Sequence, residues 1–311
     1  MLPRHILRVD QFDRMTLDHV LGHARAMRQV AERGGDERLS GKILATLFYE
    51  PSTRTRLSFE SAMLRLGGQV ISAEDASETS SAVKGESIED TVRIVESYAD
   101  AIVIRHPLAG TPERGAAVAS VPIVNAGDGA REHPTQALLD LLTISEELGR
   151  IDDLTVAMVG DLRYGRAPRS LAMLLGLTRN CRLNLVAPPG IEMAGDVLRT
   201  LSELGVGISF EPDLMDVASD VDVIYVTRVQ RERFPSDEAY RAARGSYRFT
   251  TEHLRVMKRD SIVMHPLPRL DEVDPGVDAD PRSAYFRQAR NGVFMRMALL
   301  DLLLQPSGVL V

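Results

Sequence analysis

The sequence is poor in cysteine, in lysine and in long apolar runs. Cys181 is the single cysteine, so the chain cannot build a disulfide or a cysteine-based zinc site from its own residues. No apolar run approaches the ~18 residues that a membrane-spanning helix needs, and the first residues contain no apolar signal-peptide core. We therefore expect a soluble, cytoplasmic protein.

The balance of charge excludes further classes of protein. The formal net charge is −7 and the pI is about 5.6, which argues against a protein that binds nucleic acid or an anionic membrane surface. The 37 basic residues are arginines except for Lys42, Lys84 and Lys258. Because lysine is so scarce, an amine at one of these positions is of interest for its own chemistry.

The apolar pattern predicts an α/β protein. Short β-branched runs alternate with helical stretches, which is typical of domains built on parallel sheets. With 311 residues, 44% of them hydrophobic, the chain is long enough for two domains with separate cores. Strands are predicted at 42–50, 69–74, 101–106, 121–127, 154–161, 182–188, 206–212, 221–227 and 261–268. Helices are predicted at about 56–66, 87–99 and 111–119.

Two longer helical stretches are predicted to connect the halves. Residues 134–149 have leucines at helical spacing and end in glycine, and residues 283–305 are apolar on one face. We predict two doubly wound domains, with boundaries at 1–134 and 150–284. Residues 135–149 and 285–311 would be interdomain helices, the second of which returns to the first domain.

The stretch "FYEPSTRTRLSFE", residues 48–60, places hydroxyls and guanidiniums where a strand meets a helix. The first N–H groups of a helix have no intrahelical partner, and the helix dipole makes that end favourable for an anion. Ser52 is a good N-cap residue, Thr53 and Thr55 add donors, and the fork of Arg54 matches two phosphate oxygens. The stretch therefore predicts a site for a dianion such as phosphate.

Two common phosphate-binding motifs do not fit this stretch. The chain has no Gly-x4-Gly-Lys-Ser/Thr, and "VGDLRYGRAP" at 159–168 has fewer glycines than a dinucleotide-binding fingerprint. The second arginine, Arg56, has a structural alternative, namely ion pairs with Glu50 and Glu60.

Several blocks of sequence resemble one enzyme family. "FYEPSTRTRLSFE" resembles the carbamoyl phosphate loop of the aspartate/ornithine transcarbamoylases. The resemblance continues in "KGE" at 84–86, "IVIRHP" at 102–107, "NAGDGAREHPTQALLDL" at 125–141, "DLRYGRAPRSL" at 161–171, "VTRVQRERF" at 226–234 and "HPLPR" at 265–269. The blocks follow the family's order over nearly the whole chain. They imply transfer of a carbamoyl group from carbamoyl phosphate to the amine of aspartate, a step of pyrimidine biosynthesis.

The resemblance implies a binding site for carbamoyl phosphate. It is formed by Ser52, Thr53, Arg54, Thr55, Arg105, His133, Gln136, Leu267 and Pro268, the last two through backbone groups. Arg54 would neutralise charge on the departing oxygen. Thr55, Arg105 and His133 would surround the carbonyl oxygen, and Gln136 would hold the carbamoyl nitrogen. The expected catalytic residues are Arg54, Thr55, Lys84, Arg105 and His133.

The second substrate brings two carboxylates. Arg166 and Arg228 each follow a predicted strand, and arginine binds carboxylates in a bidentate manner. The resemblance adds Gln230, and it adds Ser80 and Lys84 from a neighbouring chain of a homotrimer. The residue before this lysine is often basic or polar in the family, whereas here it is Val83.

The resemblance also implies a simple mechanism. Glu50 and Arg233 would pair when the site closes. No residue resembles a covalent nucleophile, and we expect Cys181 to be a small core residue. The aspartate amine would attack directly, with the leaving phosphate or Lys84 as proton acceptor, and neither a cofactor nor a metal is expected.

Two alternative functions and one further partner stay open. An ornithine-specific enzyme would have Ser-Met-Gly and His-Cys-Leu-Pro motifs, but no Ser-Met-Gly occurs and "HPLPR" has proline where that cysteine would be. A non-catalytic relative would usually lose part of the phosphate loop or the two arginines, which this chain keeps. A separate regulatory chain is a further partner that the sequence neither requires nor excludes.

Overall fold

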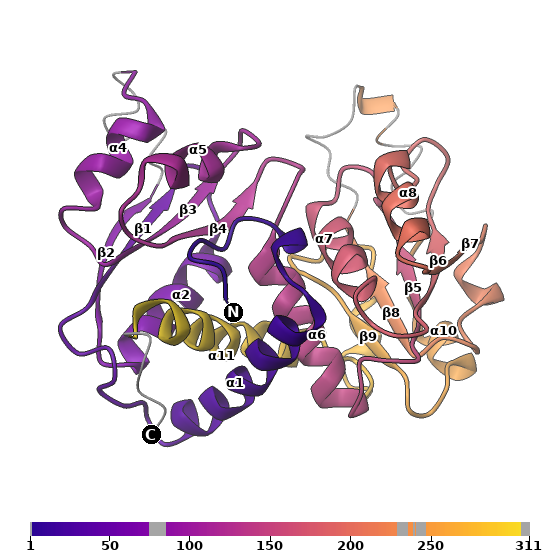
Figure 1. The fold of residues 1–311 in the computed structure, drawn as a ribbon. Coiled ribbons are helices and arrows are strands. Elements are labelled where there is room, and N and C mark those ends of the chain that lie inside the picture. Colours follow the sequence, from indigo (N-terminus) through magenta and orange to yellow (C-terminus); the bar gives the residue numbers. More distant parts are fainter. Residues whose placement is uncertain (1, 75–84, 229–235, 239, 241–246, 306–311) are drawn as a thin grey trace. The chain divides into compact units, whose positions relative to one another are not determined.

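The computed structural model describes residues 2–74, 85–228, 236–238, 240 and 247–305 (Figure 1). Contacts between Cα atoms divide the chain into two compact units. Unit 1 comprises Met1–Thr135 and Arg290–Val311, and unit 2 comprises Gln136–Ala289. The domain boundaries given above stay a prediction.

Unit 1 is built on a parallel sheet of four strands in the order β2-β1-β3-β4. The strands are β1 (Ile43–Phe48), β2 (Gln69–Glu74), β3 (Ala101–His106) and β4 (Ile123–Asp128). The helices are η1 (Val9–Gln11), α1 (Arg14–Glu32), α2 (Thr53–Arg65), α4 (Ile88–Val95) and α5 (Thr111–Val118). One face of the sheet packs against α4 and α5, and Thr46 on the other face bonds Glu60 of α2.

Unit 2 is built on a parallel sheet of five strands in the order β7-β6-β5-β8-β9. The strands are β5 (Thr155–Val159), β6 (Arg182–Val186), β7 (Gly207–Phe210), β8 (Val223–Val226) and β9 (Ile262–Met264). The helices are α7 (Arg166–Leu175), α8 (Gly195–Glu203), η3 (Leu214–Asp216), α10 (Thr251–Val256) and η5 (Pro275–Val277). Buried side chains from β5, β8, η3, α10 and η5 form one hydrophobic cluster.

Two long helices cross from one unit to the other along the chain. They are α6 (Pro134–Leu148) and α11 (Tyr285–Leu304). The C-terminal part of α11 lies in unit 1, where Asp301 contacts His23 of α1 at 2.7 Å and Arg38 at 3.0 Å. The prediction that this helix returns to the first half of the chain is confirmed.

The predicted α/β fold with two parallel sheets is also confirmed. β2 and β3 have the predicted limits, and the remaining strands are shorter than predicted by one to several residues. Helix α2 begins at Thr53 rather than near 56, because the residues of the phosphate-binding motif themselves form its first turn. Sequence reasoning assigned no helix to Arg14–Glu32, although Asp13 caps it by accepting a hydrogen bond from the Thr16 N–H at 2.7 Å.

Two expectations from composition can be compared with the structure. Cys181 is buried, and burial raises the pKa of its thiol to about 12, as expected for a core residue rather than a reactive thiol. No helix among the described residues is long and apolar enough to cross a membrane.

Candidate functional site

Both sheets contain a position where the direction of winding reverses. In unit 1 the chain passes from β1 outward to β2 and then returns to β3 on the other side of β1. In unit 2 it passes from β5 to β6 and β7 and returns to β8 on the other side of β5. Ligands of doubly wound sheets bind in the crevice outside the carboxyl ends of the two strands that flank such a reversal. The candidate residues of each unit can therefore be compared with these two positions.

The predicted phosphate-binding residues of unit 1 follow β1, one of the two flanking strands. Ser52 is at the N-cap position of α2, but its side chain makes no capping hydrogen bond. The predicted cap is therefore correct in position and wrong in its bonding. Thr53 and Arg54 are exposed in the first turn of α2, and Thr55 is buried. The N–H groups of this turn have no intrahelical acceptor, which suits an anion.

Arg56 has a structural role in unit 1. Its guanidinium lies 2.7 Å from Glu74 of β2 and 3.7 Å from Glu60 of its own helix. The carboxylate of Glu60 also accepts hydrogen bonds from Thr46 and Ser72. Arg56 thus ties α2 to the sheet, as the alternative reading proposed, but with Glu74 in place of Glu50.

Arg105 is the penultimate residue of the other flanking strand, β3. Its side chain is only 8% exposed, and it donates to the Glu50 carboxylate at 2.8 Å and to the Ala126 carbonyl at 3.2 Å. The ion pair offsets the cost of burying the guanidinium. Glu50 thus has an ion-pair partner in unit 1, whereas Arg233, its predicted partner, lies outside the described residues.

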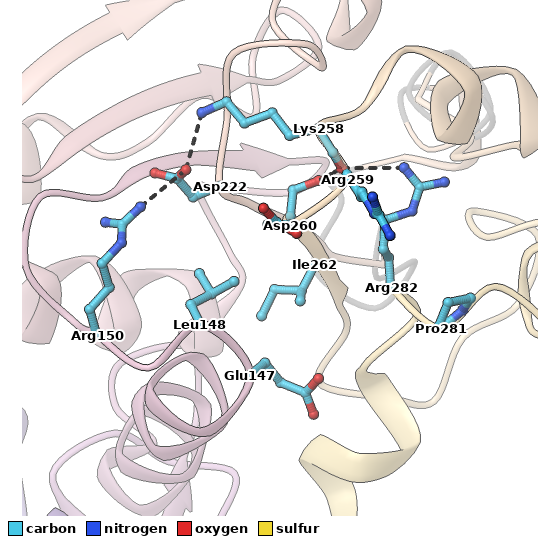
Figure 2. A pocket seen from close by; sticks show the side chains of 11 residues that line it. Glu147, Leu148, Arg150, Asp222, Lys258, Arg259, Asp260, Ile262, Pro281 and Arg282 are labelled. Carbon is cyan, nitrogen blue, oxygen red and sulfur yellow. Dashed lines mark hydrogen bonds and ion pairs between the residues drawn. The ribbon is translucent and has the colours of Figure 1, made fainter.

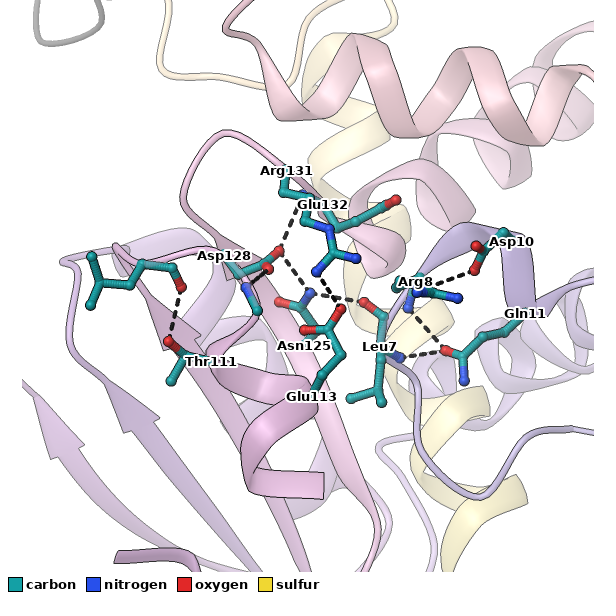
Figure 3. A network of polar contacts seen from close by, with 12 residues as sticks. Leu7, Arg8, Asp10, Gln11, Thr111, Glu113, Asn125, Asp128, Arg131 and Glu132 are labelled. Atoms are coloured by element: carbon teal, nitrogen blue, oxygen red, sulfur yellow. Dashed lines mark hydrogen bonds and ion pairs between the residues drawn. The ribbon is translucent and has the colours of Figure 1, made fainter. Parts of the chain in front are cut away.

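The loop that leads to His133 is fixed by a polar network around Asp128 (Figure 3). The carboxylate of Asp128 accepts from the Asn125 side chain at 3.0 Å, from the Glu132 N–H at 3.1 Å and from the Gly110 N–H at 2.8 Å. Gly129 has φ 52°, and a Cβ atom there would lie 2.9 Å from the Pro107 carbonyl oxygen, so a larger residue would be strained. His133, which is buried, follows this rigid loop and immediately precedes α6.

The predicted aspartate-binding arginines of unit 2 follow the two strands that flank its reversal. Arg166 is the first residue of α7, and the loop before it is held by Asp161, which accepts from the backbone N–H groups of Arg163 and Tyr164. Arg228 follows β8 and is half-buried. Gly160, which follows β5, has φ 106°. A Cβ atom there would lie 2.4 Å from the carbonyl oxygen of Thr227, the residue that follows β8.

The segment after β9 is ordered by a buried histidine. His265 accepts a hydrogen bond from the Leu267 N–H at Nδ1, at 2.8 Å. Its proton is therefore on Nε2, which lies 2.8 Å from the Glu272 carboxylate. Leu267 has φ 56°, a left-handed conformation that is rare for a branched residue, and its bond to Pro268 is cis. The backbone of this predicted substrate-binding pair is thus fixed from one side by His265.

Gln136 lies in the first turn of α6, and three other predicted residues cannot be placed. The Gln136 side chain donates to Asp140, one turn later, at 2.8 Å. Ser80, Lys84 and Gln230 lie outside the described residues. Asp140 was not singled out from the sequence.

A separate pocket of about 840 Å³ lies in unit 2 (Figure 2). It is lined by residues next to the amino ends of β8 and β9, the opposite end of the sheet from Arg228, and by residues at the end of α6 and before α11. In it, the Asp222 carboxylate lies 3.1 Å from Lys258 and 3.3 Å from Arg150. Burial opposes ionisation of Asp222, but hydrogen bonds from Thr155 and Lys258 hold its pKa below the ordinary value. None of the predicted site residues lines this pocket.

Comparison with known proteins covers both units. Residues 4–146 match the family model for the carbamoyl-P binding domain of aspartate/ornithine carbamoyltransferase, and residues 152–303 match the model for its Asp/Orn binding domain. A chloroplastic aspartate carbamoyltransferase of Arabidopsis thaliana is 54% identical, over 94% of this chain and 76% of its own length. The aspartate carbamoyltransferase catalytic subunit of Methanopyrus kandleri is 51% identical, over 97% of both chains.

The solved structures that resemble this chain include complexes with ligands. Aspartate transcarbamoylase from Trypanosoma cruzi in complex with carbamoyl phosphate superposes with a TM-score of 0.92 and 43% identity, covering 97% of this chain and 96% of that one. The same protein in complex with N-(phosphonacetyl)-L-aspartic acid gives a TM-score of 0.92 at 44% identity, with the same coverage.

The buried His265 makes the stability of the protein depend on pH. Burial lowers the pKa of His265 more than its hydrogen bond to Glu272 raises it. The unfolded chain therefore binds more protons than the folded chain once the pH falls below about 6.5, and stability is lost as the pH falls further. We expect His265→Gln to flatten the fall in the free energy of unfolding between pH 7 and pH 5. Urea denaturation at both pH values and at one protein concentration measures this, and parallel pH slopes for the two proteins would contradict it.

Proposed function

We propose that this chain, which belongs to the aspartate/ornithine carbamoyltransferase family, transfers the carbamoyl group of carbamoyl phosphate to the amine of L-aspartate. The products are N-carbamoyl-L-aspartate and phosphate, and the reaction is a step of pyrimidine biosynthesis. One observation supports this most directly. The phosphate-binding motif follows β1 and Arg105 lies at the carboxyl end of β3, the two strands that flank the reversal of unit 1, and Arg166 and Arg228 follow those of unit 2.

Unit 1 supplies the groups that carbamoyl phosphate requires. Its phosphate is dianionic and would bind the first turn of α2, with Ser52, Thr53 and Arg54 as side-chain donors. As the amine attacks, negative charge develops on the carbonyl oxygen, where donors fixed in advance are most effective. Arg105 and His133 are suited to this task, because the Glu50 ion pair and the loop around Asp128 restrict their positions before substrate binds.

Unit 2 supplies the groups that aspartate requires. Arg166 and Arg228 would each bind one carboxylate in a bidentate manner. The backbone next to Arg228 and the segment at Leu267 and Pro268 are both packed closely, so the carboxylates would be held at a defined spacing. Ornithine would bring an ammonium group in place of the second carboxylate, and an arginine at that position repels it.

The reaction needs no covalent intermediate. In direct attack, the aspartate nitrogen forms a bond to the carbonyl carbon, the bond from that carbon to the phosphate oxygen breaks, and a proton leaves the nitrogen. Phosphate, as it departs, can take this proton, and Lys84 is the second candidate. Arg54 would stabilise the charge that collects on the departing oxygen.

A homotrimer with shared sites completes the proposal. Ser80 and Lys84 belong to the segment that connects the edge strand β2 with α4, and they would reach the site of a neighbouring chain. The outer face of α2 supports a contact between chains, because Leu57 and Leu64 are 50% and 62% exposed beside a groove of about 560 Å³.

A cytoplasmic location stays a prediction, since some of the compared relatives are chloroplastic.

Arg54 is expected to act mainly in the transition state. Arg54→Ala should lower kcat by about 10³-fold or more, because it removes a charged donor to the departing oxygen, while carbamoyl phosphate binding weakens much less. Steady-state kinetics and calorimetric titration measure the two quantities. Arg56→Ala is the matched control, since it removes the ion pair to Glu74 and should reduce stability rather than kcat. An Arg54 variant with normal kcat and weak binding would refute this role.

The two arginines of unit 2 are expected to determine aspartate binding. Arg166→Ala and Arg228→Ala should each raise the KM for aspartate by about 10- to 100-fold, the cost of a lost hydrogen bond to a charged group, with carbamoyl phosphate still bound. Arg163 is an exposed arginine of the loop before α7, so Arg163→Ala is the control and should leave this KM unchanged. Unchanged aspartate kinetics in both variants would place the carboxylate site elsewhere.

The shared site is tested by mixing inactive chains. Arg54→Ala and Lys84→Ala should each be nearly inactive alone. After dissociation, mixing and reassembly, every mixed trimer contains one interface that pairs an intact Arg54 with an intact Lys84, so activity should return. If verified hybrids stay inactive, each site is built within one chain.

A further inference from the structure

A carboxylate buried in unit 2 connects the predicted site to two distant parts of the sequence. Asp140, in the middle of α6, is 0% exposed. Its Oδ1 atom accepts from Gln136 Nε2 at 2.8 Å and from Gln288 Nε2 at 2.6 Å, and its Oδ2 atom accepts from the Tyr225 hydroxyl at 2.7 Å. Of these four side chains, only Gln136 has a role in the mechanism above.

The direction of each hydrogen bond in this network is determined by the backbone. The His265 N–H can only donate, and it donates to Gln288 Oε1 at 2.9 Å. Gln288 must therefore present Nε2 to Asp140. An ionised carboxylate oxygen only accepts hydrogen bonds, so the Gln136 atom 2.8 Å from Oδ1 is also Nε2. Shape alone would not distinguish the two ends of this amide, but the network does.

The orientation of Gln136 determines what it can offer to a ligand. With Nε2 bonded to Asp140, its Oε1 atom is turned away from that carboxylate. None of the described residues donates a hydrogen bond to this oxygen, and the side chain is only partly buried. A fixed acceptor of this kind bonds an N–H group and gains nothing from a methyl group of similar size.

We propose that Asp140 is a positioning residue, which locks the Gln136 amide with its oxygen toward the substrate and so selects a carbamoyl group over an acetyl group. This inference rests on the proposed function, because it assigns Gln136 to the carbamoyl nitrogen. Acetyl phosphate has the same phosphate and carbonyl as carbamoyl phosphate and differs in having CH₃ in place of NH₂. The arginines and the first turn of α2 bind the groups that both molecules share, so the discrimination has to come from an acceptor such as Gln136 Oε1.

Tyr225, a further partner of Asp140, provides a control. Burial and then the charge of Asp140 raise the pKa of the Tyr225 hydroxyl well above its ordinary value, so Tyr225 stays a donor to Oδ2. Tyr225→Phe removes this bond and leaves Oδ1, with both glutamine contacts, in place. It should reduce stability, as the loss of a buried hydrogen bond does, without changing the orientation of Gln136.

The test compares the dissociation constants of carbamoyl phosphate and acetyl phosphate by calorimetric titration of the whole protein. The wild type should prefer carbamoyl phosphate, and Asp140→Leu should reduce this preference by about 10-fold, the value of one hydrogen bond, because the Gln136 amide is free to turn. Asp140→Asn should keep the preference, since its oxygen can take the place of Oδ1 while its NH₂ group faces Tyr225. Tyr225→Phe should keep it as well.

The outcomes separate this inference from the proposed function. A wild type without carbamoyl transfer to aspartate would refute the function, whereas an active wild type with an unchanged preference in Asp140→Leu would refute only the role of Asp140. If Asp140→Leu does not fold, Asp140→Ala replaces it, because a water molecule can satisfy Gln288 and Tyr225 without fixing Gln136. Asp140→Asn is a test that does not depend on the Leu or Ala variant. If it loses the preference for carbamoyl phosphate over acetyl phosphate, the inference is overturned.

Discussion

The reversal of winding in each sheet is the constraint on which the proposed site depends. Parallel strands need crossover connections, and a sheet that is wound in both directions leaves the carboxyl ends of two neighbouring strands uncovered. Strands β1 and β3 occupy this position in unit 1, and β5 and β8 occupy it in unit 2. The apolar strands themselves stabilise the fold. The segments that follow them can therefore contain the polar and charged residues that a binding site needs.

The charged groups at these positions are held by interactions of different strength. Arg105 is almost fully buried and has a carboxylate partner, so its position is fixed before any ligand arrives. Arg54 lies at the exposed start of α2, the end at which the helix dipole favours an anionic ligand.

The fold could be predicted from the sequence because it depends on local patterns, and the same patterns place the candidate site residues near strand ends. The β-branched runs gave the limits of β2 and β3, whereas α2 was predicted to start near residue 56 and begins at Thr53. The bonding of single side chains was less predictable. Ser52 was expected to cap α2 with its hydroxyl and does not, and the carboxylate that pairs with Arg56 most closely comes from the neighbouring strand rather than from Glu50. These details depend on tertiary packing, which no local pattern contains.

Asp140 shows most clearly what the sequence alone could not predict, and its hydrogen bonds show how tertiary contacts can orient a side chain of the site. In the sequence it is an acidic residue among leucines, and its partners Tyr225 and Gln288 are 85 and 148 residues away. Arginines attract any anion of suitable size, so they bind phosphate and carboxylates with little regard to the rest of the molecule. An amide whose direction is fixed through a chain of hydrogen bonds distinguishes NH₂ from CH₃, groups that a charge cannot separate. Attraction and recognition thus use different parts of the fold: segments that follow strands in the first case, and a buried network that ends on a backbone N–H in the second.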